Sequence, residues 1–107
     1  MLLDRAVFRM YVKKGCPFCD EARELIVTKL NSTLQAIDVT NYPELHNGII
    51  EQTGHKTVPA IFLGDEFVGG CDDLKNNQES AEFRVKVLTE EISILRSEVM
   101  RLRRSLY

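Results

Sequence analysis

The chain of 107 residues has the length of one domain, and its 44% hydrophobic content is ordinary for a globular protein. Its net charge of -2 argues against a general affinity for nucleic acid or anionic membranes. No apolar stretch reaches the roughly 20 residues that cross a bilayer. Asp4 and Arg5 come too early for a signal peptide, and three cysteines without a longer pattern are typical of a reducing compartment. We therefore expect a cytoplasmic protein.

The hydrophobic pattern predicts strands and helices that alternate along the chain. Strands are expected at residues 6–13, 33–39, 58–63 and 66–68. Helices are expected at residues 16–30, at 42–52, in a short segment after Asp72-Asp73, and from about residue 79 to the end. The first two strands predict a parallel crossover, and the Gly64-Asp65 turn predicts an antiparallel hairpin. The order β-α-β-α-β-β-α-α predicts an α/β fold.

Two thiols lie three residues apart in Cys16-Pro17-Phe18-Cys19, directly between the first predicted strand and the first predicted helix. Cys16 is thereby placed at a helix N-terminus, whose partial positive charge stabilises a thiolate. The thiolate is the nucleophilic form of cysteine. Cys19 lies one helical turn further on, close enough to form a disulfide with Cys16. The motif therefore predicts a redox-active dithiol.

A structural zinc site is the main alternative for two cysteines at this spacing. Such a site needs four ligands, and the remaining candidates, Cys71, His46 and His55, offer no second close pair. We therefore expect no metal. Cys71 is interpreted as a small packing residue, with regulatory oxidation as the less favoured alternative.

Two further segments bear on the dithiol. Pro59 in Thr57-Val58-Pro59 enters an apolar strand, and its peptide bond is either an ordinary trans bond at a strand start or a cis bond. A cis bond would leave the Val58 backbone free to pair with an extended peptide. In Gly69-Gly70-Cys71-Asp72-Asp73 the glycines permit close backbone approach, and the N–H groups of the following helix can receive a carboxylate. A plain turn and helix cap is the simpler interpretation of this segment.

Together these motifs resemble the dithiol glutaredoxins over residues 7–88. The resemblance rests on Lys13 three residues before Cys16, on Cys-Pro-Phe-Cys, on Thr57-Val58-Pro59 and on Gly69-Gly70-Cys71-Asp72-Asp73. It implies a thioredoxin-like fold, with a four-stranded mixed sheet flanked by helices. The implied activity is that of a glutathione-dependent thiol-disulfide oxidoreductase in electron transport and cell redox homeostasis. Thioredoxins fit less well, because their motif carries a tryptophan and this chain has none.

The resemblance also implies a role for each matching residue. Cys16 is the implied nucleophile toward a disulfide or a glutathionylated cysteine, and Cys19 is the implied resolving thiol. The implied glutathione-binding residues are Lys13, Phe18, His46, Thr57, Val58, Pro59, Gly70, Cys71, Asp72 and Asp73. The implied partners are glutathione as reductant, disulfide or glutathionylated protein substrates, and glutathione reductase indirectly.

Each part of glutathione has an implied contact in this set. Lys13 would pair with the glycine carboxylate, and His46 falls where many members carry Gln or Arg for the same group. The Val58 backbone would pair with the cysteinyl part, and Asp72 and Asp73 would meet the γ-glutamyl end. The Phe18 ring would line the groove.

The C-terminal residues carry an unbroken 3-4 hydrophobic repeat: Val85, Leu88, Ile92, Leu95, Val99, Leu102 and Leu106. Its β-branched residues Val85, Ile92 and Val99 fall at position a of a heptad, and Leu88, Leu95 and Leu102 fall at d, which favours two parallel strands. Glutamates at g precede arginines at e by five residues, as Glu91 precedes Arg96 and Glu98 precedes Arg103. This offset pairs opposite charges between parallel helices.

We therefore expect a glutaredoxin domain at residues 1–84 and, at 85–107, a helical extension that continues the last domain helix and forms a homodimeric coiled coil. Docking of the heptad on its own domain and binding of a foreign helix are the alternatives. Phe83 and Val87 should face the core, and the domain should offer no further surface beyond Ile92. Two other functions stay open, namely a redox-sensing adaptor dimerised by this helix and a dimeric iron–sulfur cluster carrier.

Overall fold

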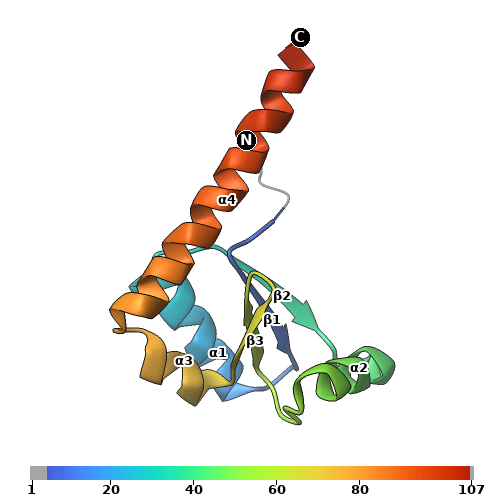
Figure 1. Cartoon of the computed structure of the whole chain (residues 1–107). Helices are drawn as coiled ribbons and strands as arrows, with labels where there is room; N and C mark the ends of the chain where they lie inside the picture. The colour runs from blue at the N-terminus through green and yellow to red at the C-terminus, as the bar shows by residue number, and fades with distance from the viewer. Residues whose placement is uncertain (1–4, 107) are drawn as a thin grey trace.

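The computed structural model describes residues 5–106 and contains a four-stranded mixed sheet with helices on both faces (Figure 1). The strands β1 (Phe8–Val12), β2 (Leu34–Asp38), β3 (Ala60–Leu63) and β4 (Glu66–Gly69) lie in the order β2-β1-β3-β4. β1 pairs parallel with β2, and β3 pairs antiparallel with both β1 and β4. The predicted crossover and hairpin are thus confirmed.

The helices follow the predicted order, with one difference in the first. They are α1 (Pro17–Glu24), η1 (Leu25–Lys29), α2 (Pro43–Thr53), α3 (Cys71–Asn77) and α4 (Ala81–Leu106). The single helix expected at residues 16–30 becomes π-helical from Leu25, where the Leu30 N–H donates to the Leu25 carbonyl at 2.9 Å. The continuous hydrophobic spacing of this stretch gave no sign of the wider turn.

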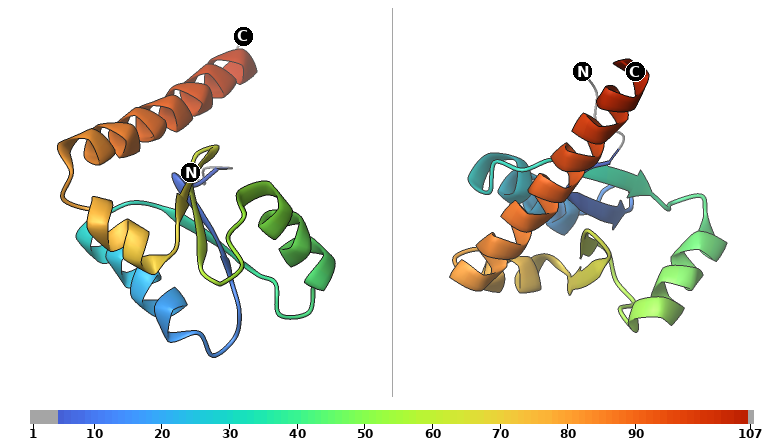
Figure 2. Two further views of the ribbon diagram at one scale, coloured as in Figure 1. Left: turned by 60° about the horizontal axis from the view of Figure 1, so that its bottom comes forward. Right: turned by 45° about the horizontal axis from the view of Figure 1, so that its top comes forward.

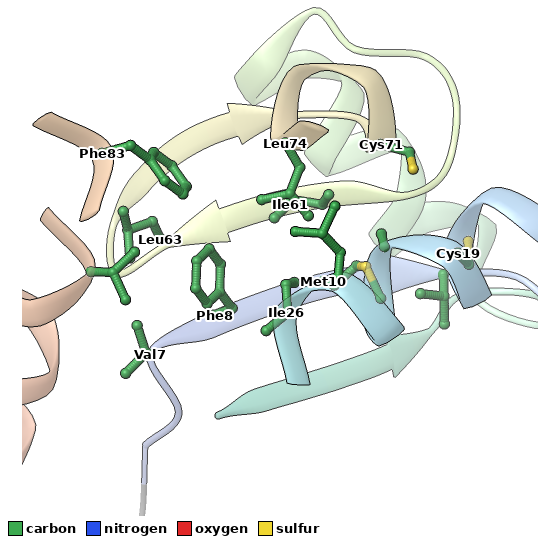
Figure 3. Close-up of a cluster of buried hydrophobic side chains, with 14 of the residues drawn as sticks. Val7, Phe8, Met10, Cys19, Ile26, Ile61, Leu63, Cys71, Leu74 and Phe83 are labelled. Atoms are coloured by element: carbon green, nitrogen blue, oxygen red, sulfur yellow. The ribbon is translucent and has the colours of Figure 1, made fainter. Parts of the chain in front are cut away.

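Two apolar cores lie on opposite faces of the sheet. Helices α1, α3 and α4 cover one face, and α2 covers the other (Figure 2). Successive residues of β1 serve both sides, because side chains alternate along a strand. Met10 is wholly buried in the larger core, and Tyr11 lies in the smaller one. The larger core includes Val7, Phe8, Met10, Cys19, Ile26, Ile61, Leu63, Cys71, Leu74 and Phe83 (Figure 3).

Helix α4 has 26 residues and a length of about 39 Å, and it extends along one side of a molecule whose extents are 46 × 32 × 23 Å. Phe83 and Val87 are buried in the larger core, as predicted. The expectation that the domain offers no further surface to the helix beyond Ile92 is wrong, because Ile94 and Glu98 are also buried. The helix therefore keeps one face against its own chain for more than half its length. Across residues 5–106, no helix combines the length and apolar character needed to cross a membrane.

Truncation of a core side chain on α3 should destabilise the whole domain. Leu74 is fully buried between α3 and the sheet, so Leu74→Ala removes apolar contacts and leaves a cavity. We expect the free energy of unfolding to fall by about 3 kcal/mol, measured by urea denaturation. Asn76→Ala, at an exposed position of the same helix, is the control and should change it little. Equal losses in the two variants would contradict this packing.

Candidate active site

Cys16 lies at the junction between β1 and α1 and forms the N-cap of the helix. Gly15 makes the turn into this position with φ +72, a left-handed conformation that residues with a side chain rarely adopt. Cys16 is extended, Pro17 occupies the first turn, and the Cys16 Sγ accepts the Cys19 N–H at 3.2 Å. An N–H that donates to sulfur stabilises negative charge there. The half-buried Cys16 sulfur is thus the better placed nucleophile of the pair.

Cys19 occupies the opposite kind of environment. Its side chain is only 2% exposed and belongs to the larger core. Burial is the main cause that raises the pKa of this thiol to about 12, and the hydrogen bond and charge of Cys16 add to it. A backbone hydrogen bond with Lys13 acts in the other direction but is outweighed. The Cys19 thiol therefore keeps its proton at neutral pH.

The segment Thr57-Val58-Pro59 lies against the dithiol. The Val58–Pro59 peptide bond is cis, one of the two forms that the sequence left open. The Cys16 thiol donates to the Val58 carbonyl, with 3.8 Å between sulfur and oxygen. Residues 42 positions apart thereby meet at one end of the sheet.

The Gly69-Gly70 turn leads from β4 into α3 beside this segment. Gly70 is the N-cap of α3, and its N–H donates to the Asp73 carboxylate at 2.9 Å. Gly69 has φ +125, and a Cβ at this position would overlap the Asp73 side chain. Asp72 and Asp73 lie exposed in the first turn of α3. The turn is therefore an ordinary helix cap that also leaves a close backbone approach beside Pro59, whose carbonyl oxygen would lie 3.6 Å from a Cβ at Gly70.

Cys71 is buried, in agreement with its interpretation as a packing residue. Burial raises the pKa of its thiol, and the negative charge of Glu21 adds to the effect. Glu21 of α1 forms an ion pair with Lys75 of α3, so the two helices are linked beside this thiol. The sulfur atoms of Cys71 and Cys19 lie at the same end of the core (Figure 3).

The remaining predicted groove residues differ in exposure. Lys13 is exposed, and the Phe18 ring is 58% exposed beside Cys16 in the chain. His46 is buried, and its Nε2 atom has no hydrogen-bond partner among the described residues. Burial lowers the pKa of His46, and the charge of Lys13 lowers it further, so the imidazole is neutral at neutral pH.

His55 is a residue near the site that the sequence suggested only as a possible zinc ligand. Its Nε2 lies 3.1 Å from the Pro59 carbonyl oxygen and 3.3 Å from the Thr57 hydroxyl. Its ring lies against Phe67, and its Cε1 atom would be 3.1 Å from a Cβ at Gly70. His55 therefore fills the space between the cis-proline segment and the Gly-Gly turn. Only its position two residues before Thr57 hinted at this contact.

The structure thus joins the dithiol, Thr57-Val58-Pro59 and Gly69-Gly70 at one end of the sheet. Among residues 5–106, no group of three or more His, Cys, Asp or Glu side chains is arranged to hold a metal ion. The three cysteines are free thiols. The geometry is that of two neighbouring thiols, one half-buried and one buried, next to the Val58 backbone, which suits thiol-disulfide exchange.

Comparisons with known proteins agree with this geometry. The glutaredoxin family model matches residues 8–68. Glutaredoxin-C6 of Oryza sativa subsp. japonica is 38% identical over 85 residues, which cover 76% of this chain and 73% of that protein. Glutaredoxin-1 of Bos taurus is 32% identical over 83 residues and covers 73% and 78%. The crystal structure of a buckwheat glutaredoxin-glutathione complex has the same fold, with a TM-score of 0.69, 24% identity and coverage of 79% and 78%.

The unequal environments of the thiols predict selective alkylation. At about pH 8, a pKa near 12 leaves on the order of one Cys19 thiol in ten thousand ionised. Iodoacetamide should therefore label Cys16 rapidly and spare Cys19 and the buried Cys71 in the folded protein, as followed by peptide mass mapping. Denatured protein should label at all three positions. Equal labelling rates for Cys16 and Cys19 in the folded protein would contradict this assignment.

Proposed function

The chain belongs to the glutaredoxin family, and on that premise we propose that it uses glutathione to reduce protein disulfides and glutathionylated cysteines. Family membership makes it an oxidoreductase. The finer assignment, with Cys16 as nucleophile and Cys19 as resolving thiol, is our proposal. A reducing compartment such as the cytoplasm suits it, because the glutathione pool there keeps such thiols reduced.

The observation that carries the proposal is the contrast between the two thiols. Cys16 is half-buried, caps α1 and receives a backbone N–H on its sulfur. Cys19 is buried and protonated, with its pKa raised to about 12 by burial. A nucleophile needs access and a stabilised anion, whereas a resolving thiol must wait until the first bond has formed.

The dithiol route follows from these roles. The Cys16 thiolate attacks one sulfur of a substrate disulfide, a Cys16–substrate S–S bond forms, and the other substrate sulfur leaves as a thiolate that takes up a proton. Cys19 then attacks the Cys16 sulfur, and its proton goes to the second substrate thiolate as this leaves. The substrate gains two electrons, and the dithiol loses two. Two glutathione molecules return them and become glutathione disulfide.

The monothiol route needs Cys16 alone. Its thiolate attacks the glutathione sulfur of a glutathionylated protein, the protein thiolate leaves and is protonated, and Cys16 carries the glutathionyl group. A second glutathione thiolate attacks the glutathione sulfur of this bond and releases Cys16. The products are glutathione disulfide and a reduced protein, so electrons balance.

The causes of the raised Cys19 pKa explain why Cys19 would react only after Cys16 has reacted. Burial is the largest, but the hydrogen bond and the charge of Cys16 also hold the Cys19 proton in place. Once Cys16 is part of a mixed disulfide, its sulfur carries no negative charge. The contribution of the Cys16 charge to the raised Cys19 pKa is then removed. The Cys19 thiol becomes more acidic at the step in which it attacks.

Glutathione, a short extended peptide, suits the surroundings of Cys16. In the proposal the Val58 backbone pairs with the cysteinyl part of glutathione. This pairing would lie next to the Cys16 sulfur, which is 3.8 Å from the Val58 carbonyl oxygen. Lys13 meets the glycine carboxylate, and the exposed Phe18 ring lines the groove. A buckwheat glutaredoxin of the same fold was solved as a glutathione complex, which supports this choice of reductant.

The γ-glutamyl end completes the proposed groove. Gly70, Cys71, Asp72 and Asp73 receive it at the start of α3, where backbone N–H groups favour a carboxylate. Thr57 and Pro59 form the adjoining wall, and the neutral imidazole of His46 completes the proposed set. The remaining proposed partners are disulfide or glutathionylated proteins, glutathione reductase indirectly, and a second copy of the chain bound through residues 85–106.

The central experiment is a turnover assay with glutathione, glutathione reductase and a small glutathione mixed disulfide. Cys16→Ser should abolish turnover, because no nucleophile remains. Cys19→Ser should keep this activity but lose the reduction of protein disulfides, because only the latter needs a resolving thiol. No turnover with both cysteines intact would overturn the enzyme and favour the adaptor. Equal loss in both variants would contradict the division of roles.

Removal of the charge at Lys13 tests the groove. Lys13→Ala should raise the KM for glutathione and lower kcat/KM roughly 3–10-fold, the effect expected when a carboxylate loses a partly exposed charged partner. Lys14→Ala is the matched control, since Lys14 is an exposed neighbour whose backbone N–H, unaffected by the change, donates to Thr40. Equal effects of the two substitutions would show a general charge effect and count against the proposed contact.

A further inference from the structure

Helix α4 has two apolar faces, and its own chain covers only one of them. Phe83, Val87 and Ile94 are buried on the covered face. The other face, called here the heptad face, is 42–79% exposed at each of its seven side chains, which are Val85, Leu88, Ile92, Leu95, Val99, Leu102 and Leu106. Docking on the domain, the first alternative for this repeat, therefore does not account for it. Seven apolar side chains in one continuous row form an interaction surface.

We infer that the heptad face binds the same face of a second copy, and that the two α4 helices form a parallel, two-stranded coiled coil. The inference specifies the geometry of the proposed pairing with a second copy. It needs no redox step and stands apart from the glutathione proposal. Its first support is the residue pattern, because β-branched residues at a with leucine at d favour the parallel dimer.

The surface relief of α4 matches the packing of such a dimer. A shallow hollow on the heptad face is bounded by Ile92, Leu95, Arg96 and Val99, with Met100 and Arg103 at its side. These first four residues are an a, d, e and a of successive turns. In a coiled coil each apolar side chain inserts into a hole formed by four such residues of the facing helix. The hollow is thus of the kind that a side chain from the second copy would fill.

Charge decides the orientation of the helices. Glu91 at g and Arg96 at e are both exposed, and a parallel pair brings Glu91 of each chain beside Arg96 of the other. An antiparallel pair would bring e positions together and set Arg96 against Arg103. The second pair suggested by the sequence, Glu98 with Arg103, does not fit the structure. Glu98 is buried on the covered face and forms an ion pair with Arg101 of its own chain.

Contacts with its own domain also hold α4 in helical form before any dimer forms. An isolated helix of three heptads is marginally stable, because nucleation is unfavourable. Here the buried contacts of Phe83, Val87 and Ile94 hold the helix in place before a partner arrives. The conformational entropy of the helix is therefore lost when the domain folds and not when the dimer forms. Apolar burial in the dimer then contributes more fully to the affinity.

The test is the molar mass of the full chain, measured by analytical ultracentrifugation over a concentration series. The expected result is a dimer that dissociates on dilution. The double variant Ile92→Glu, Val99→Glu should be monomeric throughout, because it places charges in the seam. The matched control is Ser93→Glu, Ser97→Glu, which adds the same charge at exposed positions of the same helix outside the heptad face and should remain dimeric.

A charge swap tests the parallel orientation. Glu91→Arg should weaken the dimer several-fold, and addition of Arg96→Glu should restore it, because the interchain pair is re-formed with reversed signs. Circular dichroism and turnover by Cys16 show that each variant is folded, since none of these residues lies at the dithiol. A full chain that stays monomeric at every concentration, or a dimer that survives the seam variant, would overturn the inference. Turnover without dimerisation would leave the proposed enzymatic function intact.

Discussion

The contact on which the site depends is the hydrogen bond from the Cys19 N–H to the Cys16 sulfur at 3.2 Å. It exists only because α1 begins at this point of the chain, one turn after β1 and after the left-handed Gly15. The same helix start exposes one thiol and turns the other into the core. A change in the register of α1 would alter access, acidity and spacing of both sulfur atoms together.

The rest of the site is brought to this helix start by the sheet. β1 and β3 are antiparallel neighbours, so the C-terminal end of β1 and the N-terminal end of β3 lie at the same end of the sheet. Val58 thereby reaches the Cys16 sulfur, and the β3–β4 hairpin returns Gly70 to the other side of the proline segment. His55 packs between these two segments and fixes their separation. A sheet of four strands is sufficient for this arrangement because each site segment adjoins a strand.

The features that the sequence predicted correctly are mostly those set by residues close together in the chain. The four strands, the helix start at Cys16 and the turn before α3 depend on residues close in the chain, so spacing and turn chemistry indicate them. The contacts of His55 with Phe67 and Gly70, and the burial of Ile94 in the larger core, depend on residues farther away in the sequence. No local pattern encodes these contacts. The spacing that showed a hydrophobic row on α4 likewise could not show that a second row, on another face of the helix, continues to Ile94.

The two rows of α4 connect the redox site to the proposed dimer. The covered row fixes the rotation of α4 relative to the sheet, and so it also fixes the direction in which the heptad face points. Figure 1 shows the start of α1, next to the dithiol, at the end of the molecule away from the C-terminus. A parallel pair brings both C-termini to one end, so both dithiols would lie toward the other. The proposed dimer thus places both sites toward the same end, an arrangement that an antiparallel pair would not give.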